Sequence, residues 1–137
     1  MKPLWPVSFL LFLLSTSVFT QPQETLETSG NVFLRICSVA AREDDRKQLS
    51  SDQTMAITAC INYVNGFADG VDAEMRFVMN ATKQSTHGPF CLPEGVKEIQ
   101  MVRVVLKYIR DNPAAARRNT KSLIMFSLGE RYPCPDH

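Results

Sequence analysis

His87 and Cys91 are the two residues whose types and close spacing could suggest catalysis. A cysteine beside a histidine is the arrangement that activates a thiolate nucleophile. Gly88 and Pro89 lie between them, which disfavours a shared helical face. A cysteine in an exported chain is usually oxidised, and the N-terminus described below predicts export. We therefore predict that Cys91 belongs to a disulfide and that this pair has no catalytic role.

Other charged residues give no stronger case for chemistry. Asp69, Asp72 and Glu74 offer carboxylates, but only the first two are neighbours on one helix, and both are expected to face solvent. Arg117-Arg118 suggests a solvated helix face more than a site for a phosphate or an acidic partner. The chain has two histidines and no glycine-rich phosphate loop. The sequence predicts a protein that binds a partner, with no enzymatic activity, no cofactor and no metal site.

The four cysteines predict two disulfides. They have 22, 30 and 42 residues between them and no C-x-x-C pair, so the spacing typical of zinc ligands is absent. Prolines beside Cys91 and Cys134 end the helices there, and a helical hairpin between the two cysteines returns the chain to its starting point. We predict that Cys37 pairs with Cys60, on consecutive antiparallel helices, and that Cys91 pairs with Cys134.

The N-terminus has the composition of a secretory signal. Lys2 precedes an apolar run from Val7 to Leu14, and small residues follow. We predict a signal peptide over residues 1–20, a flexible lead-in over 21–30 and one helical domain over 31–137, with an uncleaved anchor as the alternative for the first segment. Removal of Lys2 leaves 14 basic and 14 acidic side chains. This neutral balance argues against nucleic acid or an anionic membrane as the partner.

Apolar residues recur at spacings of three and four, which predicts an all-α fold. We expect Asn31 to cap the first helix. The longest helix is expected to begin at Ser51 or the residue after it and to reach about Asn80. Gly66 and Gly70 lie one turn apart beside its apolar stripe. They predict that another backbone approaches closely there, with a local kink as the alternative.

Two more helices are predicted in the second half. The third is expected after Pro93 and ends before Asn112-Pro113, because a residue that precedes proline avoids the helical region. The fourth is expected to begin near Pro113, with Gly129 as its C-cap. The predicted architecture is a small four-helix domain, made of two helical hairpins and stapled by two disulfides.

Several motifs occur in the order found in one protein family. They are Cys60-x-x-Tyr63-x-x-Gly66, then Phe90-Cys91-Leu92-Pro93, then Tyr108-Ile109, Asn112-Pro113 and Tyr132-Pro133-Cys134-Pro135. Over residues 37–135 the chain therefore resembles the Rap/Tai immunity proteins. These are small exported helical proteins of Gram-negative bacteria that neutralise peptidoglycan amidase effectors of type VI secretion systems. Members often carry Ser or Thr where this chain has Lys97, which lacks the acceptor for a full capping box with Gln100.

The resemblance implies a periplasmic, dimeric inhibitor that binds and blocks a peptidoglycan amidase or endopeptidase. Such an inhibitor inserts a protruding loop or helix end into the substrate groove of the enzyme. Two places in this chain are candidates for effector binding: a loop with Lys83, His87 and Phe90, and a helix corner with Arg110, Asp111 and Asn112. The sequence does not choose between them. A tight complex buries about 1,600 Å² in total, so helix faces must contribute beside any loop.

Two other classes stay open from the sequence. One is a helical envelope protein of the same fold that has no toxin partner. The other is a secreted helical factor, such as a cytokine-like or saposin-like lipid binder. Saposin-like domains usually carry six cysteines, whereas this chain has four. An adjacent gene for a hydrolase with cysteine and histidine motifs would favour the immunity function over both.

Overall fold

A computed structural model describes residues 25–42, 48–84 and 86–135 of the chain. All the regular elements in these residues are helices. In order they are α1 (Gly30–Cys37), η1 (Ser38–Ala41), α2 (Ser51–Thr82), α3 (Glu98–Asp111), η2 (Pro113–Arg117) and α4 (Thr120–Arg131), where η marks a short 3-10 helix. Those residues contain no β-strand, so the predicted all-α fold with four α-helices is confirmed. The predicted signal peptide, residues 1–20, lies outside the described residues. Among the helices described, none is long and apolar enough to cross a membrane.

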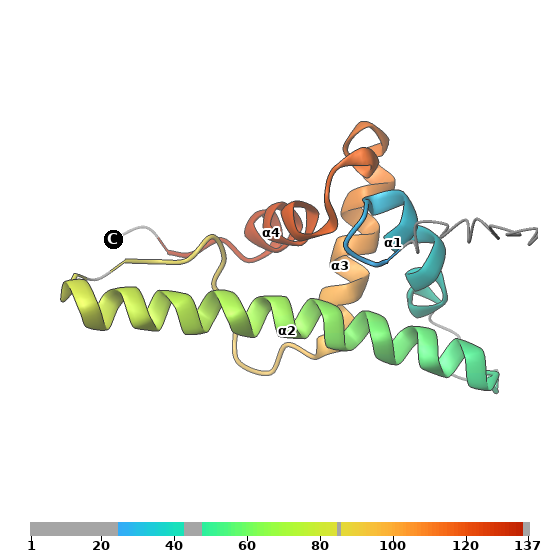
Figure 1. Cartoon of the computed structure of the whole chain (residues 1–137), viewed down its shortest axis with the longest axis horizontal. Coiled ribbons are helices and arrows are strands. Elements are labelled where there is room, and N and C mark those ends of the chain that lie inside the picture. The colour runs from blue at the N-terminus through green and yellow to red at the C-terminus, as the bar shows by residue number, and fades with distance from the viewer. Residues whose placement is uncertain (1–24, 43–47, 85, 136–137) are drawn as a thin grey trace, which may run out of the picture.

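α2 is the longest element and sets the shape of the molecule. It has 32 residues, which correspond to about 48 Å of helix. α3 rises from the middle of α2 with α1 beside it, and α4 lies on the same side of α2 as α3 (Figure 1). The last part of α2 extends beyond the other helices, and the segment that follows it runs back along it (Figure 1).

The hydrophobic core surrounds α3. Residues at spacings of three and four on α3 are buried, and α1, α2 and α4 pack around them. The buried apolar side chains of this cluster are Phe33, Cys37, Ala40, Cys60, Val64, Ala68, Phe90, Met101, Val102, Val105, Leu106, Ile109, Ala116, Leu123, Ile124 and Leu128. Full burial of one leucine- or phenylalanine-sized side chain contributes about 1.5–3 kcal/mol. This cluster is therefore the main source of stability.

Side-chain caps fix where the first two α-helices begin. The hydroxyl of Ser29 accepts a hydrogen bond from the Val32 backbone N–H, so Ser29 caps α1 and the prediction of Asn31 was wrong. α2 has a full capping box. The Ser50 hydroxyl accepts from the Gln53 N–H at 3.2 Å, and the Gln53 side chain accepts from the Ser50 N–H at 3.0 Å. The expected start of α2 is confirmed.

The start of α3 has only half of such a box. The side-chain oxygen of Gln100 accepts from the Lys97 backbone N–H at 3.0 Å. The Lys97 ammonium is a donor and has no lone pair for the helix N–H groups. The weaker definition of this helix start, expected from Lys97, follows from that chemistry.

The fourth α-helix begins later than predicted. Pro113 begins η2 instead, and α4 starts at Thr120 after Asn119, whose side chain accepts from the Lys121 N–H at 2.9 Å. The reason is tertiary. The Arg118 carbonyl accepts from the N–H of Gly30 at 3.1 Å, so the chain turns toward α1 here before it resumes helix.

Residues 25–29, part of the segment expected to be a flexible lead-in, are attached to the start of α4. The Glu27 carbonyl accepts from the Asn119 side-chain nitrogen at 2.9 Å and from the Thr120 N–H at 3.4 Å. The Glu27 carboxylate lies 3.1 Å from the Lys121 ammonium. Leu26 packs against the core. These contacts bring the N-terminal segment and α4 together.

Close backbone approaches occur at glycines other than those predicted. A Cβ at Gly66 or Gly70 would meet no atom within 4 Å, so the prediction of a close approach there was wrong. A Cβ at Gly30 would lie 2.5 Å from a leucine methyl of α4. A Cβ at Gly129 would lie 2.8 Å from the Pro89 carbonyl oxygen. Gly129 also lies within α4 and does not end it.

Both predicted disulfides are present. Cys37 and Cys60 are joined with a Cα–Cα distance of 5.9 Å, and Cys91 and Cys134 with one of 4.8 Å. The first bond lies wholly within the core, where both residues have no exposed surface. The second joins two segments outside the helices and is half-buried. We call them the core disulfide and the arm disulfide.

Candidate functional site

The end of α2 that extends past the core forms the most prominent surface feature. Ala68 is the last residue of α2 that is buried. From Asp69 to Thr82 the helix no longer packs against the core cluster except through Val71. We call α2 from Asp69 to Thr82, together with the returning segment (residues 83–84 and 86–92), the arm (Figure 1).

A groove runs between α2 and the returning segment of the arm. Its volume is about 480 Å³. Val71, Met75 and Met79 line it from α2, and residues of the returning segment between Thr86 and Leu92 line it from the other side. The two halves are close-packed at Gly88, where a Cβ would lie 3.2 Å from the Met75 Cγ. Methionine side chains adapt to the shape of a partner, so this apolar floor suits a binding surface.

Charged groups at the rim of the groove are already paired with neighbours on α2. Arg76 Nε lies 2.6 Å from the Asp72 carboxylate, and both side chains are exposed. The Asn65 amide donates to the Asp69 carboxylate at 2.9 Å. Asp69 and Asp72 were expected to face solvent, and both are exposed. Exposed pairs of this kind contribute at most about 1 kcal/mol to stability, so they remain available to a partner.

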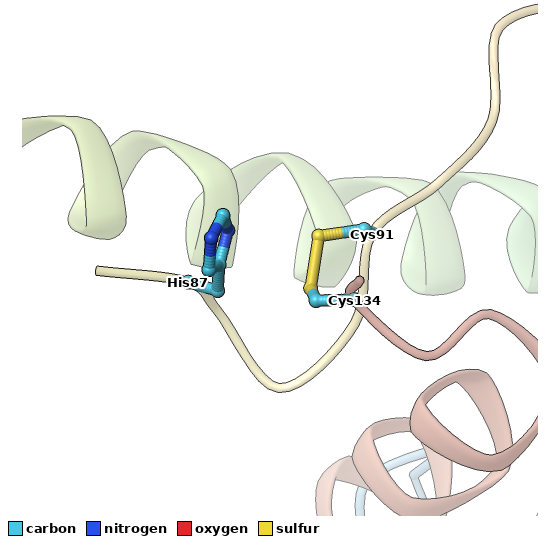
Figure 2. Close-up of side chains that lie close together, drawn as sticks. All are labelled: His87, Cys91 and Cys134. Atoms are coloured by element: carbon cyan, nitrogen blue, oxygen red, sulfur yellow. A yellow bond between two sulfur atoms is a disulfide. The ribbon is translucent and has the colours of Figure 1, made fainter. Parts of the chain in front are cut away.

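The returning segment brings His87 toward both arm cysteines. The chain turns through a U between His87 and Cys91, and their side chains face each other across its mouth, with Cys134 bonded to Cys91 (Figure 2). One donor atom from each of the three residues lies within 4.8 Å of the others. The cysteines are oxidised, so no thiolate nucleophile is present beside His87. Sequence analysis placed His87 near Cys91 and paired Cys91 with Cys134, but spacing did not show that the imidazole would face the bonded sulfurs.

The loop residues proposed from the sequence take different positions in the arm. Lys83 ends α2 in the left-handed conformation, with φ of 57°, and is exposed. His87 is exposed at the groove. Phe90 is only 8% exposed and belongs to the core cluster. Its burial attaches the returning segment to the core.

The helix corner lies at the far end of α3 from α2, away from the arm (Figure 1). The polar groups of its residues contact their own helix. Arg110 Nε donates to the Leu106 carbonyl at 3.2 Å, and the Asn112 amide donates to the Tyr108 carbonyl at 3.0 Å. Asp111 accepts from the Lys107 ammonium at 2.6 Å. A partner that used this corner would have to replace these local contacts.

Phe77 was missed by sequence reasoning. It lies on the arm and is 73% exposed, the most exposed large apolar side chain in the described part of the chain. By helical spacing its neighbours Met75 and Val78 fall on the apolar stripe of α2, but they are only half-buried. Apolar residues in the arm part of α2 have the same helical spacing as those in the part that packs against the core. What it could not show is that the core ends at Ala68.

Comparison with known proteins places the chain in a family. A family model described as Rap1a immunity proteins matches residues 29–134. No curated protein and no solved structure matched the chain. The matched range begins at the cap of α1 and ends at the second cysteine of the arm disulfide, so it includes all the helices described above. The chain belongs to the Rap1a immunity protein family, which indicates an immunity function against an effector protein.

Proposed function

We propose that this chain is a periplasmic immunity protein that binds and blocks a peptidoglycan amidase effector of a type VI secretion system. The observation that carries the proposal is the family match over residues 29–134. The secretory composition of residues 1–20 supports export to the compartment that holds peptidoglycan. Inhibition in this proposal is steric: the bound protein excludes the substrate and performs no chemistry.

The arm is the surface that we propose for effector binding. It combines an exposed aromatic side chain, Phe77, with an adaptable apolar groove of about 480 Å³. Aromatic residues surrounded by such surface dominate the binding energy of protein interfaces. A complex of standard size needs about 800 Å² from each partner, which is more than one loop provides. The exposed face of α2 in the arm extends the contact beyond the loop.

Within the arm, Lys83 and His87 are proposed to contact the effector directly. Both are exposed and lie on the segment that follows α2. Phe90 is proposed to act from the core side, by holding the returning segment in place. The corner residues Arg110, Asp111 and Asn112 are the second choice, because their polar groups already bind neighbouring groups of α3.

A homodimer is part of the same proposal and rests on the family resemblance. An inhibitor with two arms would bury more surface than one chain provides. Light scattering on the purified domain measures this state directly. A mass equal to one chain at micromolar concentration would remove the dimer from the proposal and leave the binding function standing.

The test is periplasmic rescue. A candidate peptidoglycan amidase effector is expressed with an export signal, together with either the full-length protein or a form that lacks residues 1–20. Full-length protein should prevent lysis, and the truncated form should not, although both accumulate. Rescue by both forms would reject the periplasmic site of action. Rescue by neither would reject the immunity function and favour an envelope protein of the same fold.

A further inference from the structure

We propose that His87, Cys91 and Cys134 form a zinc site when the arm disulfide is reduced, so that a metal ion can replace the disulfide as the link between the arm and the C-terminal segment. The donor atoms of the three residues already lie within 4.8 Å of one another. Two thiolates and an imidazole are a ligand set that zinc accepts in proteins. This inference does not depend on the proposed effector binding, although His87 takes part in both.

The spacing that zinc requires lies between the two distances in the structure, 2.05 Å between the bonded sulfurs and up to 4.8 Å to the His87 nitrogen. Zn–S bonds of about 2.3 Å and Zn–N bonds of about 2.0–2.1 Å place tetrahedral ligands about 3.5–3.8 Å apart. The imidazole nitrogen, within 4.8 Å of the sulfurs, has to approach them by about 1 Å. The two sulfurs have to separate from bonding distance, which rotation about their Cα–Cβ bonds can supply. The fourth position is left to water.

The backbones that carry the cysteines are held together by contacts other than the disulfide. The Cys91 N–H donates to the Tyr132 carbonyl at 2.9 Å. Phe90, next to Cys91, is buried in the core. Gly129 of α4 packs so closely on the Pro89 carbonyl that a Cβ would lie 2.8 Å from it. Reduction therefore leaves two thiols side by side, which favours capture of a metal ion.

The chemistry balances with a dithiol as the reductant. The dithiol loses two electrons and two protons and closes to its own disulfide, while the arm disulfide opens and its sulfurs become the thiols of Cys91 and Cys134. Zinc then displaces the two thiol protons and accepts the lone pair of one imidazole nitrogen of His87. The core disulfide has no exposed surface, so the reductant reaches the arm disulfide first.

The experiment uses the full chain, treated with a dithiol and then freed of it under nitrogen. A thiol count of two per chain is expected. The reduced chain should bind one Zn²⁺, and one Co²⁺ should give thiolate-to-metal charge-transfer absorption. His87→Ala should weaken zinc binding by at least about tenfold. Thr86→Ala, which changes the adjacent groove residue, is the matched control and should bind as the unmodified chain does.

Three results would overturn the proposal. One is the absence of stoichiometric zinc binding by the reduced chain. The second is equal affinity in His87→Ala, which would remove the imidazole from the site. The third is equal binding by the double variant Cys91→Ser, Cys134→Ser after the same treatment, which would assign the metal to Cys37 and Cys60. Circular dichroism of each variant establishes that the helices persist in the samples compared.

Discussion

The two disulfides place the same covalent bond in opposite surroundings. The core disulfide joins α1 to α2 where neither residue has exposed surface. The arm disulfide joins two segments outside the helices, and Cys91 lines the groove of the arm. One bond lies within packed apolar side chains, and the other shapes a surface beside His87. The buried core disulfide therefore contributes to stability, whereas the half-buried arm disulfide can also contribute to binding.

Loop length alone would give the arm disulfide the larger contribution to stability. The residue numbers of the paired cysteines differ by 23 in the core disulfide and by 43 in the arm disulfide. The chain-entropy model gives about 3.4 and about 4.0 kcal/mol for loops of these lengths. The difference of about 0.6 kcal/mol is smaller than the cost of a cavity left in a close-packed core. We therefore expect that removal of the core disulfide costs more stability than removal of the arm disulfide.

The largest predicted effect is the loss of the core disulfide. The double variant Cys37→Ala, Cys60→Ala should lose about 5 kcal/mol of unfolding free energy, from loop entropy and the cavity together. Cys91→Ala, Cys134→Ala should lose about 3 kcal/mol, because the Cys91–Tyr132 hydrogen bond and buried Phe90 still hold the segment. Urea unfolding of both variants measures the difference. A larger loss from the arm variant would mean that loop length outweighs burial.

Two glycines extend the comparison to the backbone. A Cβ at Gly30 would lie 2.5 Å from Leu123 in the core and 2.9 Å from the Ala116 carbonyl, whereas one at Gly129 would lie 2.8 Å from the Pro89 carbonyl of the arm. Gly30→Ala should cost about 2–3 kcal/mol, and Gly129→Ala about 1 kcal/mol because its Cβ meets one backbone carbonyl and no second residue. Thermal melting compares them. Equal losses would show that the arm is packed as rigidly as the core.

Effector binding is predicted to depend on the arm end of α2 and not on its opposite end. Phe77 and Met55 lie toward opposite ends of this helix and are 73% and 65% exposed. Phe77→Ser should weaken effector binding by at least about tenfold, whereas the matched change Met55→Ser should not. Neither should alter unfolding free energy by more than about 0.5 kcal/mol. Calorimetric titration with the effector gives both affinities, and equal losses would move the interface off the arm.

A smaller effect is expected at the exposed glycines of α2. Gly70→Ala should raise unfolding free energy by about 0.5–1 kcal/mol, because alanine costs less entropy in a helix and the new Cβ meets no atom within 4 Å. Gly66→Ala should behave alike. Chemical unfolding with both variants checks the sign. A loss of stability would mean that a partner chain packs against this face.

Local and periodic features of the fold were predictable from the sequence. Helical spacing located α2 and α3, and proline positions with the even cysteine count led to the correct disulfide pairs. The failure at Gly66 and Gly70 has a physical reason: small residues one turn apart mark a helix face, but not which face meets another helix. The approach of His87 to Cys134 depends on a bend and on a contact between distant segments. Gly88-Pro89 indicated the bend and the cysteine pattern indicated the contact, but the local sequence does not show that the bend directs His87 toward the bonded sulfurs.

The last prediction concerns Tyr63, near the boundary between core and solvent. Its hydroxyl is buried without a hydrogen-bond partner among the described residues. Burial, with a smaller effect of the Glu27 carboxylate, raises the pKa of Tyr63 from 10.0 to about 12. Between pH 10 and pH 12 the unfolded chain therefore loses this proton while the folded chain keeps it. Stability is fully present below pH 10 and falls as pH rises through this window.

Tyr63→Phe removes both the unpaired hydroxyl and the titration. At pH 7 the variant should be as stable as the original chain or more stable by about 1 kcal/mol, because no buried hydroxyl is left unsatisfied. Its advantage should widen between pH 10 and pH 12. Urea midpoints across this range, with Tyr108→Phe as the matched tyrosine control, measure the change. An advantage that narrows with rising pH would mean that the phenolate of Tyr63 is stabilised in the folded chain, contrary to its burial.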